Sequence, residues 1–478
     1  MMVRAIQVVS TLWVVFYVLA AMTAAGHALL HKRDPRSAWG WIAVCWLFPL
    51  GGAALYWLFG INRVERYALE VSDRARRMIT RDSMTYESGL PSDIVASASY
   101  RELERAGATA GGNPLVGGNR VEPLYNGDQA YPAMLDAIAA ARDSIYLATY
   151  IYSDDEAGRR FTAALEQACR RGVRVRVLLD GVSDFFYHPR ASRMLASHHV
   201  PYSLFLPLRL WPPRLHINLR NHRKLLLVDG EIAFTGGMNV AEYHILKGRS
   251  ARPVADLQFR ICGPLVGQLE SVFRADWCFA AGEVLPASAA SIINAGSAAC
   301  RAIIDGPDNQ REPFMLVLMA ALATAHRSVC IITPYFMPPA PIVAALQATV
   351  MRGIEVNILL PLASDQPWID SATRHALPPL LRHQVRLHYG LAPFAHTKLL
   401  LVDDEYVQFG SANLDVRSLR LNFELNVEAY DRPLAATLRQ YFESQLLNAR
   451  RVGAEELDRR RLPERLRDAF CWLFSPYM

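Results

Sequence analysis

The feature that most constrains the fold of this chain is an internal repeat. The stretch NHRKLLLVDG occupies residues 221–230 and AHTKLLLVDD occupies 395–404, so His222 and His396 stand 174 positions apart (396 − 222). In both copies a lysine follows the histidine by two residues and an aspartate follows the lysine by five. A repeat on this scale predicts two structural units of the same kind.

The similarity extends upstream of the polar residues. Each copy reads as a helix, a strand ending in Tyr150 or Tyr335, a second helix, a glycine (Gly172 or Gly353) and another strand. A glycine just past a helix is a common stop signal. Helices alternating with short β-branched strands predict βαβ units and largely parallel sheets. The predicted fold class is therefore α/β, with two homologous halves related by a pseudo-twofold axis.

Two apolar segments precede the repeat. Residues 5–30 carry one histidine as their sole ionisable side chain other than tyrosine, and residues 38–61 carry only Cys45 and Tyr56. About 20 apolar residues suffice to cross a bilayer as a helix. The segments predict a transmembrane helical hairpin over residues 1–62, although Pro49 and the glycines after it could make the second segment re-entrant. Arginines at the N-terminus and after the second segment, on the side of the main domain, outnumber the basic residues of the short loop between the segments. This excess favours a cytoplasmic main domain.

Residues 63–118 are expected to form a polar connector. Its first part is either an amphipathic helix at the membrane surface or an ordinary solvated helix. The glycine-rich residues 106–119 predict the loop that ends it. The two halves are then expected at 119–290 and 291–478.

Composition limits the partner and the role of cysteine. The net charge of +6 favours an anionic partner, either lipid or nucleic acid. The seven cysteines form no CxxC pair, and most have apolar neighbours. Buried free thiols are therefore expected, and a disulfide framework or zinc site is not.

The repeated motif can be interpreted from strand geometry. Side chains alternate along a strand, so His222 and Lys224 share a face, as do His396 and Lys398. The motif aspartates fall on the opposite parity, which favours a bracing role. After each motif come a second strand, a bend of small residues and an asparagine. The motif aspartates are Asp229 and Asp403, and the asparagines that follow are Asn239 and Asn413.

Two imidazoles, two ammonium groups and two amides facing across a twofold axis suit a phosphodiester. Lysines and asparagines would hold the nonbridging oxygens, one histidine would attack phosphorus, and the other would protonate the leaving oxygen. This chemistry requires no metal or other cofactor, and the histidine spacing lacks the HExxH pattern of a zinc site.

At these residues the chain resembles the phospholipase D superfamily, whose signature is HxKxxxxD followed by a small-residue turn and asparagine. More narrowly, the apolar hairpin, RNHRK at 220–224 and NLDVRSLRLNFE at 413–424 resemble bacterial cardiolipin synthases with two transmembrane segments. The resemblance covers essentially the whole chain. It implies a multi-pass protein of the bacterial inner membrane that acts on phosphatidylglycerol and other membrane phospholipids, and not on nucleic acid, with a homo-oligomer possible.

The resemblance also implies residue roles. One motif histidine would form a phosphohistidine, with His222 favoured as nucleophile and His396 as acid and then base, although the sequence does not distinguish them. The superfamily motif counts Asp229 and Asp403 with the catalytic histidines and lysines. Downstream carboxylates orient the histidines in the family, and Asp256 and Glu424 match those positions. Ser411 stands where the first copy has Gly237.

The implied reaction joins two phosphatidylglycerol molecules into cardiolipin and releases glycerol. Alternatives are a phospholipase D-type hydrolase or headgroup-exchange enzyme, a nuclease of the superfamily, and a non-enzymatic lipid-binding scaffold. A mixed aromatic and basic segment at 184–215 could form a lipid-facing mouth, with Trp368 as its counterpart, although core packing of part of it is the alternative.

Overall fold

The computed structural model describes residues 2–32, 35–60, 98–208, 219–248, 250–288, 294–307 and 312–475. The chain divides into two compact units, Met1–Tyr67 and Ala68–Met478. The first part of the expected connector lies outside the described residues.

The N-terminal unit is helical. It contains α1 (Met2–His31), α2 (Pro35–Leu47), α3 (Pro49–Leu55) and a π-helical turn (Tyr56–Gly60). Small residues of α1 pack against Cys45 and Tyr56, and His27 Nδ1 lies 2.7 Å from the Tyr56 hydroxyl. Residues 10–31 of α1 form one helix that is long and apolar enough to cross a membrane.

The second apolar segment differs from the expected single span. Its helix breaks at Phe48, between α2 and α3. Pro49 provides no backbone N–H for a helix continuing from α2, and its ring disfavours helical geometry at the preceding residue. Two short helices and a π-helical turn therefore replace one long helix.

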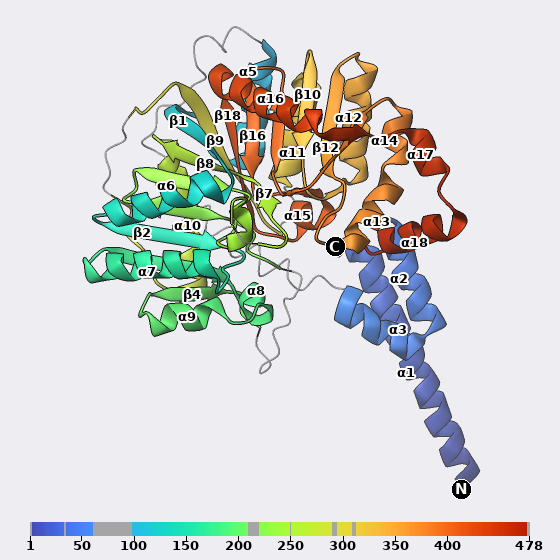
Figure 1. Ribbon diagram of the computed structural model, residues 1–478. Coiled ribbons are helices and arrows are strands. Elements are labelled where there is room, and N and C mark those ends of the chain that lie inside the picture. Colours follow the sequence, from blue (N-terminus) through green and yellow to red (C-terminus); the bar gives the residue numbers. More distant parts are fainter. Residues whose placement is uncertain are drawn as a thin grey trace. The chain divides into compact units, whose positions relative to one another are not determined.

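The larger unit is built on one 15-stranded sheet (Figure 1). The first half contributes, in spatial order, β1 (Val116–Tyr125), β8 (Leu257–Cys262), β6 (Ile232–Gly236), β5 (Leu225–Val228), β2 (Ser144–Thr149), β3 (Arg174–Asp180) and β4 (Tyr202–Phe205). The second half contributes β9 (Ala298–Asp305), β18 (Glu424–Tyr430), β16 (Tyr406–Gly410), β15 (Leu399–Val402), β10 (Ser328–Ile332), β12 (Glu355–Pro361) and β13 (Arg386–Gly390), with β19 (Ala449–Arg451) at the edge.

The same strand order therefore runs outward twice from the centre, where β1 and β9 pair antiparallel. This arrangement is that of two homologous halves related by a pseudo-twofold axis through the centre of the sheet. The expectation of largely parallel sheets was wrong. Within the 15-stranded sheet, parallel pairing is confined to β2–β3–β4 and β10–β12–β13, where helices connect the strands, while the hairpins β5–β6 and β15–β16 and their neighbours are antiparallel.

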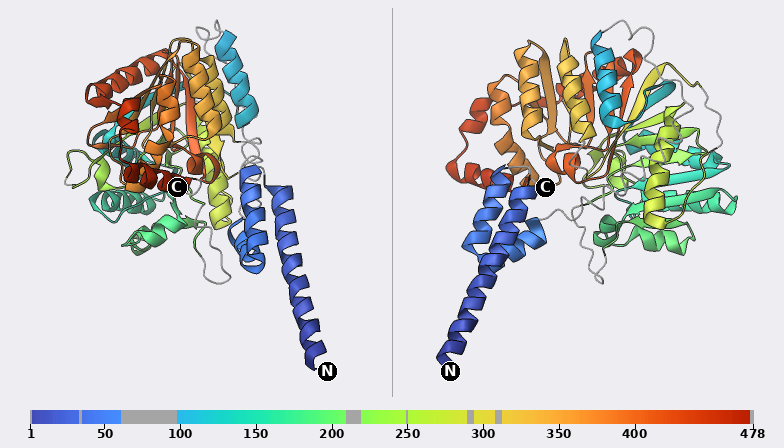
Figure 2. Two further views of the ribbon diagram at one scale, coloured as in Figure 1. Left: turned by 90° about the vertical axis from the view of Figure 1, so that its right-hand side faces the viewer. Right: turned by 180° about the vertical axis from the view of Figure 1, so that it is seen from behind.

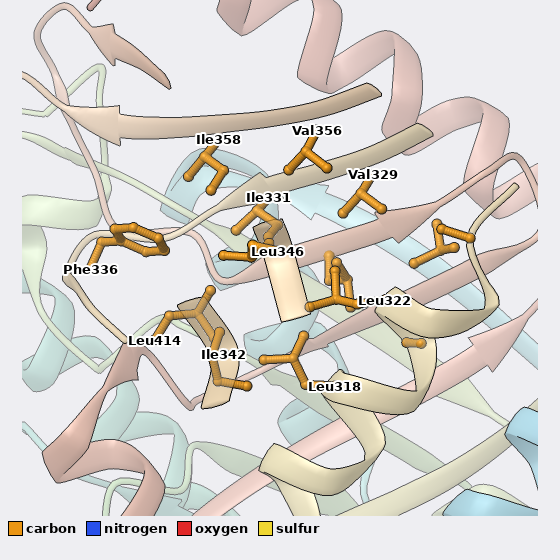
Figure 3. Close-up of a cluster of buried hydrophobic side chains, with 14 of the residues drawn as sticks. Leu318, Leu322, Val329, Ile331, Phe336, Ile342, Leu346, Val356, Ile358 and Leu414 are labelled. Atoms are coloured by element: carbon orange, nitrogen blue, oxygen red, sulfur yellow. The ribbon is translucent and has the colours of Figure 1, made fainter. Parts of the chain in front are cut away.

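Helices cover both faces of the sheet (Figures 1 and 2). In the first half, α6 (Asn126–Ala140) and α7 (Glu156–Arg170) cover one face and α10 (Leu265–Ala281) covers the other. In the second half, α11 (Pro313–Thr324) and α12 (Ala340–Met351) cover one face and α16 (Arg432–Leu447) covers the other. Equivalent helices therefore cover equivalent faces of the two halves, as expected for a twofold axis that runs between the antiparallel strands β1 and β9. In the second half, Leu318, Leu322, Val329, Ile331 and Leu346 interlock between helices and strands (Figure 3).

Short elements complete the unit. They are α8 (Gly181–Phe186), α9 (Ala191–Ser197), α13 (Pro367–Ala376), α14 (Pro378–Arg382), α15 (Val416–Arg420), α17 (Ala454–Asp458), α18 (Leu462–Trp472), the 3₁₀ turn Glu242–His244, and the two-residue strands β7 (Val254–Ala255), β11 (Phe336–Met337), β14 (Phe394–Ala395) and β17 (Leu414–Asp415).

The end of the expected connector is part of the second half. Helix α5 (Ala98–Gly111) packs against α11, and Tyr100 and Leu103 are buried in that half's core (Figure 2). Residues 106–111, predicted as loop, belong to this helix. At Gly107 a Cβ atom would lie 2.0 Å from the buried Arg301 guanidinium. Small residues here therefore allow close helix packing, and do not mark a loop.

Candidate active site

The two motif histidines are held by backbone contacts between the halves. His222 donates its N–H to the carbonyl of Phe423 at 3.0 Å, and Asn221 forms a β-bridge with Phe423. In the other half, His396 donates its N–H to the carbonyl of Ala255 at 2.7 Å, next to the pairing of β14 with β7. Each motif therefore lies against the segment of the opposite half that leads into a carboxylate.

Those carboxylates contact the imidazoles. His222 Nδ1 lies 3.0 Å from Glu424 Oε2, and His396 Nδ1 lies 2.9 Å from Asp256 Oδ2. An ionised carboxylate can only accept, so each ring carries its proton on Nδ1 and directs the lone pair of Nε2 elsewhere. The structure brings together all four residues, and it pairs each histidine with the carboxylate of the other half.

Ser411 supports one of these pairs. Its hydroxyl donates to Glu424 Oε2 at 2.5 Å, and its carbonyl lies 3.1 Å from His222 Nδ1. The corresponding residue of the first half, Gly237, has no side chain, and a Cβ there would lie 2.4 Å from Asp256 Oδ2. The two halves therefore hold their carboxylates differently.

Both motif lysines are buried beside their histidines. Lys224 Nζ donates to the His222 carbonyl at 2.7 Å and lies 5.3 Å from the centre of the Tyr150 ring. Lys398 Nζ lies 2.9 Å and 3.0 Å from the two ring nitrogens of His396. The ammonium groups thus stand next to the imidazoles, as phosphate binding would require.

Burial sets the charge of the imidazoles. It lowers the pKa of His222 to about 4, against the opposing effect of Glu424 and with further lowering by Lys224 and Lys398. The pKa of His396 is also lowered to about 4, first by burial and then by Lys398 and Lys224. Each histidine is influenced by the lysine of the other half, so the two motifs share one site, and both rings are neutral at pH 7.

The lysines and carboxylates are shifted as well. Burial lowers the pKa of Lys224 to about 7 and that of Lys398 to about 8, with Glu424 and Asp256 partly offsetting it. Burial acts to raise the pKa of Glu424, but His222, Lys224 and Ser411 outweigh it and lower the pKa to about 2. The pKa of Asp256 is also lowered, because its interactions with His396 and Lys398 exceed the effect of burial. Both carboxylates are therefore ionised.

The two asparagines are buried near the motifs but differ in their contacts. Asn239 Oδ1 accepts from the Ile151 N–H at 3.2 Å, and its amide lies 3.3 Å from the Tyr243 hydroxyl. Asn413 Oδ1 is buried and has no hydrogen-bond partner among the described residues. Within the described part of the chain, neither side chain forms a hydrogen bond with a motif histidine, so their role toward phosphate stays a prediction.

The motif aspartates lie at the far ends of β5 and β15. Asp229 accepts from the backbone N–H groups of residues 142, 143 and 144 at 2.8–2.9 Å. Asp403 accepts from those of residues 326, 327 and 328 at 2.8–3.1 Å. Grouping these aspartates with the catalytic residues does not fit this placement, because their oxygens are used in holding the turns before β2 and β10. The bracing role expected from strand parity fits it.

Aromatic residues around the motifs were not assigned a site role from the sequence. The Tyr150 ring lies 5.0 Å from that of His222, and the Tyr335 ring lies 6.4 Å from that of His396. His244 is buried, its ring 6.3 Å from His396, and its Nε2 accepts from the Asn239 N–H. The equivalent positions of the two tyrosines at strand ends were a usable signal. His244 has no repeat counterpart and offered none.

The segment 184–215 is described only in part, because residues 209–218 lie outside the described residues. Phe185, Phe186 and Tyr187, at the end of α8, are 43–60% exposed. Trp368, at the start of α13, is 54% exposed. These exposures argue against core packing of the four aromatic side chains, and their role as a lipid-facing mouth stays a prediction.

Across the part of the chain that the structure describes, no group of three or more histidine, cysteine, aspartate or glutamate side chains could hold a metal ion.

Fold and site together define a phospholipase D-type protein with paired motifs. A family model described as "Cardiolipin synthase, PLD-like domain" matches residues 134–277 and 318–446, and a "Phospholipase_D-nuclease N-terminal" model matches 11–60. The chain belongs to the cardiolipin synthase family.

Relatives extend over nearly the whole chain. The major cardiolipin synthase of Bacillus subtilis is 30% identical, covering 98% of this chain and 99% of its own. Cardiolipin synthase A of Pseudomonas entomophila is 31% identical, with 92% of each chain covered. The crystal structure of phosphatidylserine synthase from Haemophilus influenzae covers 79% of this chain and all of its own at a TM-score of 0.62 and 14% identity, which supports the fold alone.

Proposed function

We propose that this protein is a cardiolipin synthase that joins two phosphatidylglycerol molecules through a phosphohistidine intermediate. One observation carries the mechanism: each half supplies an imidazole whose Nδ1 is paired with a carboxylate from the other half. Neutral imidazoles with the lone pair on Nε2 can act as nucleophile and base. Two buried ammonium groups beside them suit a substrate that keeps a negative charge throughout.

In the first step, His222 Nε2 attacks the phosphorus of a phosphatidylglycerol. The bond from phosphorus to the glycerol oxygen breaks, and glycerol leaves with a proton from His396, forming a phosphatidyl-histidine. Contacts of His222 Nδ1 with both Glu424 and the Ser411 carbonyl support this assignment, because they fix the tautomer whose Nε2 is free. The anionic substrate favours the protonated form of His396, offsetting the effect of burial.

In the second step, the terminal hydroxyl of a second phosphatidylglycerol gives its proton to His396 and attacks the same phosphorus. The bond from phosphorus to His222 breaks, releasing cardiolipin and the free imidazole. One phosphodiester replaces another, so the reaction needs no nucleotide. Lys224, Lys398, Asn239 and Asn413 would hold the nonbridging oxygens. Water competing at this step would produce phosphatidic acid, which favours a site closed by lipid.

Membrane placement is part of the proposal. Residues 1–62 would form a membrane hairpin with two spans in a bacterial inner membrane, followed by halves at 119–290 and 291–478 on the cytoplasmic side. Supporting it are the apolar residues 10–31 and the outward-facing Leu12, Trp13 and Leu30, each more than half exposed. The exposed aromatics of α8 and Trp368 would contact lipid at the mouth.

Product analysis tests the reaction. Purified protein in phosphatidylglycerol micelles should form cardiolipin and glycerol in equal amounts, whereas phosphatidic acid as the main product would favour a hydrolase. His222→Ala and His396→Ala should each abolish turnover, and near-normal activity of either would refute the two-histidine mechanism. With a phosphodiester carrying a p-nitrophenyl leaving group, which needs no acid, His396→Ala should still accumulate the intermediate on His222. Detection of the phosphatidyl group on a residue other than His222 would contradict the assignment of His222 as the nucleophile.

A further inference from the structure

The pseudo-twofold arrangement is broken beside the site in one respect. The histidines, lysines and asparagines repeat with a constant offset of 174, as for Asn413 and Asn239 (413 − 239). At the same offset, Arg220 corresponds to Phe394 (394 − 220), and Arg417 corresponds to Tyr243 (417 − 243). One side of the site thus carries two guanidinium groups where the related side carries two aromatic rings.

Both arginines belong to segments that build the site. Arg220 precedes His222 by two residues, and its carbonyl accepts from the Phe423 N–H at 2.8 Å. Arg417 lies in α15, four residues after Asn413. Both lie close enough to the Tyr150 hydroxyl to offset part of the burial that raises its pKa to about 12, and the Tyr150 ring is 5.0 Å from that of His222. The two arginines therefore come from opposite halves and gather around the same tyrosine.

Arg220 lacks partners for buried donors. Its Nε and Nη1 atoms are buried and have no hydrogen-bond partner among the described residues. The half-buried side chain of Arg417 likewise forms no hydrogen bond or ion pair with the described residues. The fully buried arginines near the sheet differ, since Arg223 pairs with Asp276 and Arg301 with Glu428. Buried donors without acceptors cost free energy, which a bound anion would offset.

Asp180 interacts electrostatically with Arg220, and Asp415 with Arg417, but both carboxylates already accept backbone hydrogen bonds. Asp180 accepts from the N–H groups of Ser183 at 2.7 Å and Asn221 at 2.9 Å. Asp415 caps α15 by accepting from the Ser418 N–H at 2.7 Å. Burial raises the pKa of each to about 6, so both remain mostly ionised at pH 7. Their oxygens are nevertheless occupied by backbone N–H groups, and the buried Nε and Nη1 of Arg220 stay without an acceptor among the described residues.

We propose that Arg220 and Arg417 bind the non-reacting phosphodiester of the acceptor lipid. The inference rests on the proposed function. Cardiolipin contains two phosphodiesters joined by one glycerol, so when one phosphorus is held by the histidines and lysines, the second anion lies a single glycerol bridge away. Guanidinium groups suit such an anion because they offer paired donors and keep their charge. On the related side, Phe394 and Tyr243 stand in place of the two arginines, so the guanidinium groups define the side from which the acceptor enters.

The test compares two acceptors with one donor. Phosphatidylglycerol micelles are incubated with labelled glycerol, which exchanges into phosphatidylglycerol through the same intermediate but brings no phosphate. Cardiolipin formation and label incorporation are measured together for wild type, Arg220→Gln and Arg417→Gln, with Arg160→Gln, on the exposed face of α7, as matched control. Each site variant should lose cardiolipin formation by at least tenfold and change glycerol exchange by less than about threefold, with Arg160→Gln unchanged in both.

A parallel loss of both products, with unchanged thermal unfolding, would overturn the proposal by placing the arginines on the donor. Unchanged cardiolipin formation would overturn it as well. If Gln variants unfold, Arg220→Lys and Arg417→Lys replace them, and the same selective loss is expected, because a single ammonium cannot reproduce the fork. Failure of the proposed function itself looks different, since wild type would then incorporate glycerol or release phosphatidic acid without forming cardiolipin.

Discussion

At the scale of single residues, burial decides the charges of the site. The imidazoles of His222 and His396 are neutral because desolvation outweighs the nearby carboxylates. The same burial brings the pKa values of Lys224 and Lys398 into the range of 7 to 8. These lysines are thus the groups of the site whose charge changes just above neutral pH.

A pH dependence follows from these lysines. Below their pKa values they are protonated and can hold an anionic phosphate, and the charge is lost as pH rises through about 7 for Lys224 and about 8 for Lys398. Because kcat/KM reports groups of the free enzyme, it should fall on raising the pH from 7 to 9. Lys224→Arg, which stays charged, should move the start of this decline from about pH 7 to about pH 8, where Lys398 loses its charge. A flat wild-type profile between pH 7 and 9 would contradict the lowered pKa values.

The orienting carboxylates offer a second prediction. Glu424→Gln and Asp256→Asn keep the size of the side chain but allow the wrong histidine tautomer, so kcat should fall by about 10²- to 10⁴-fold. Steady-state rates and thermal unfolding should show this loss without unfolding, whereas Glu231→Gln, on the exposed turn after β5, should change neither.

A merely structural role would predict a different pattern. Because Glu424 is proposed to act through His222, adding Glu424→Gln to His222→Ala should cause no further loss of the residual rate. An additional loss of tenfold or more would show that Glu424 acts independently of that histidine.

At the scale of elements, the motif aspartate is a connection between a hairpin and a neighbouring strand. Asp229 has a φ of 54° and Asp403 one of 52°, a left-handed conformation that aspartate tolerates better than most residues. From that position each carboxylate accepts three backbone N–H groups. The conformation and the hydrogen bonds together hold the ends of β5 and β15 against the turns that precede β2 and β10.

Replacing these aspartates should therefore reduce stability. Asp229→Ala leaves three backbone donors without their acceptor, and we expect a decrease of about 2–4 kcal/mol in the free energy of unfolding, measured by urea denaturation. Asp229→Asn, which keeps one oxygen acceptor, should lose less. Activity per folded molecule at low temperature should stay within about threefold of wild type. A folded Asp229→Ala protein without activity would contradict the structural role and indicate that Asp229 takes part in catalysis.

At the scale of the whole molecule, the two halves depend on each other. Neither half contains a complete site, since His222 needs Glu424 and His396 needs Asp256. Pairing of β1 with β9 makes one sheet of both halves, and α5, which precedes the first half in sequence, packs in the core of the second. The site is thus a product of the joined halves.

The N-terminal unit is separate from that assembly, which leads to a prediction on truncation. A chain lacking residues 2–60 should keep a cooperative unfolding transition, because the larger unit has its own cores. Membranes of cells expressing it should release it with alkaline carbonate, whereas the full chain should require detergent. Equal resistance of both chains to carbonate would show that the N-terminal helices are not the membrane anchor.

Much of this protein followed from its sequence alone. The repeat at an offset of 174 indicated two α/β halves, and the HxK spacing indicated that each histidine and lysine share a face, because these patterns depend on local geometry. Strand parity also placed Asp229 and Asp403 away from the reacting atoms. Local patterns could not distinguish the parallel strands from the antiparallel ones, nor the glycine-rich end of α5 from a loop, because both depend on partners far away in the chain.

Only the tertiary structure decided how the site is assembled. The sequence provided two histidines and two carboxylates. Their pairing across the halves depends on where β8, which follows Asp256, and β18, which begins with Glu424, lie in the joined sheet. The same holds for Arg220 and Arg417, which are 197 residues apart (417 − 220) and yet gather near Tyr150. Sequence patterns report which side chains share a face of one element. Which elements face each other, and how deeply a charge is buried, is set by packing of the whole chain.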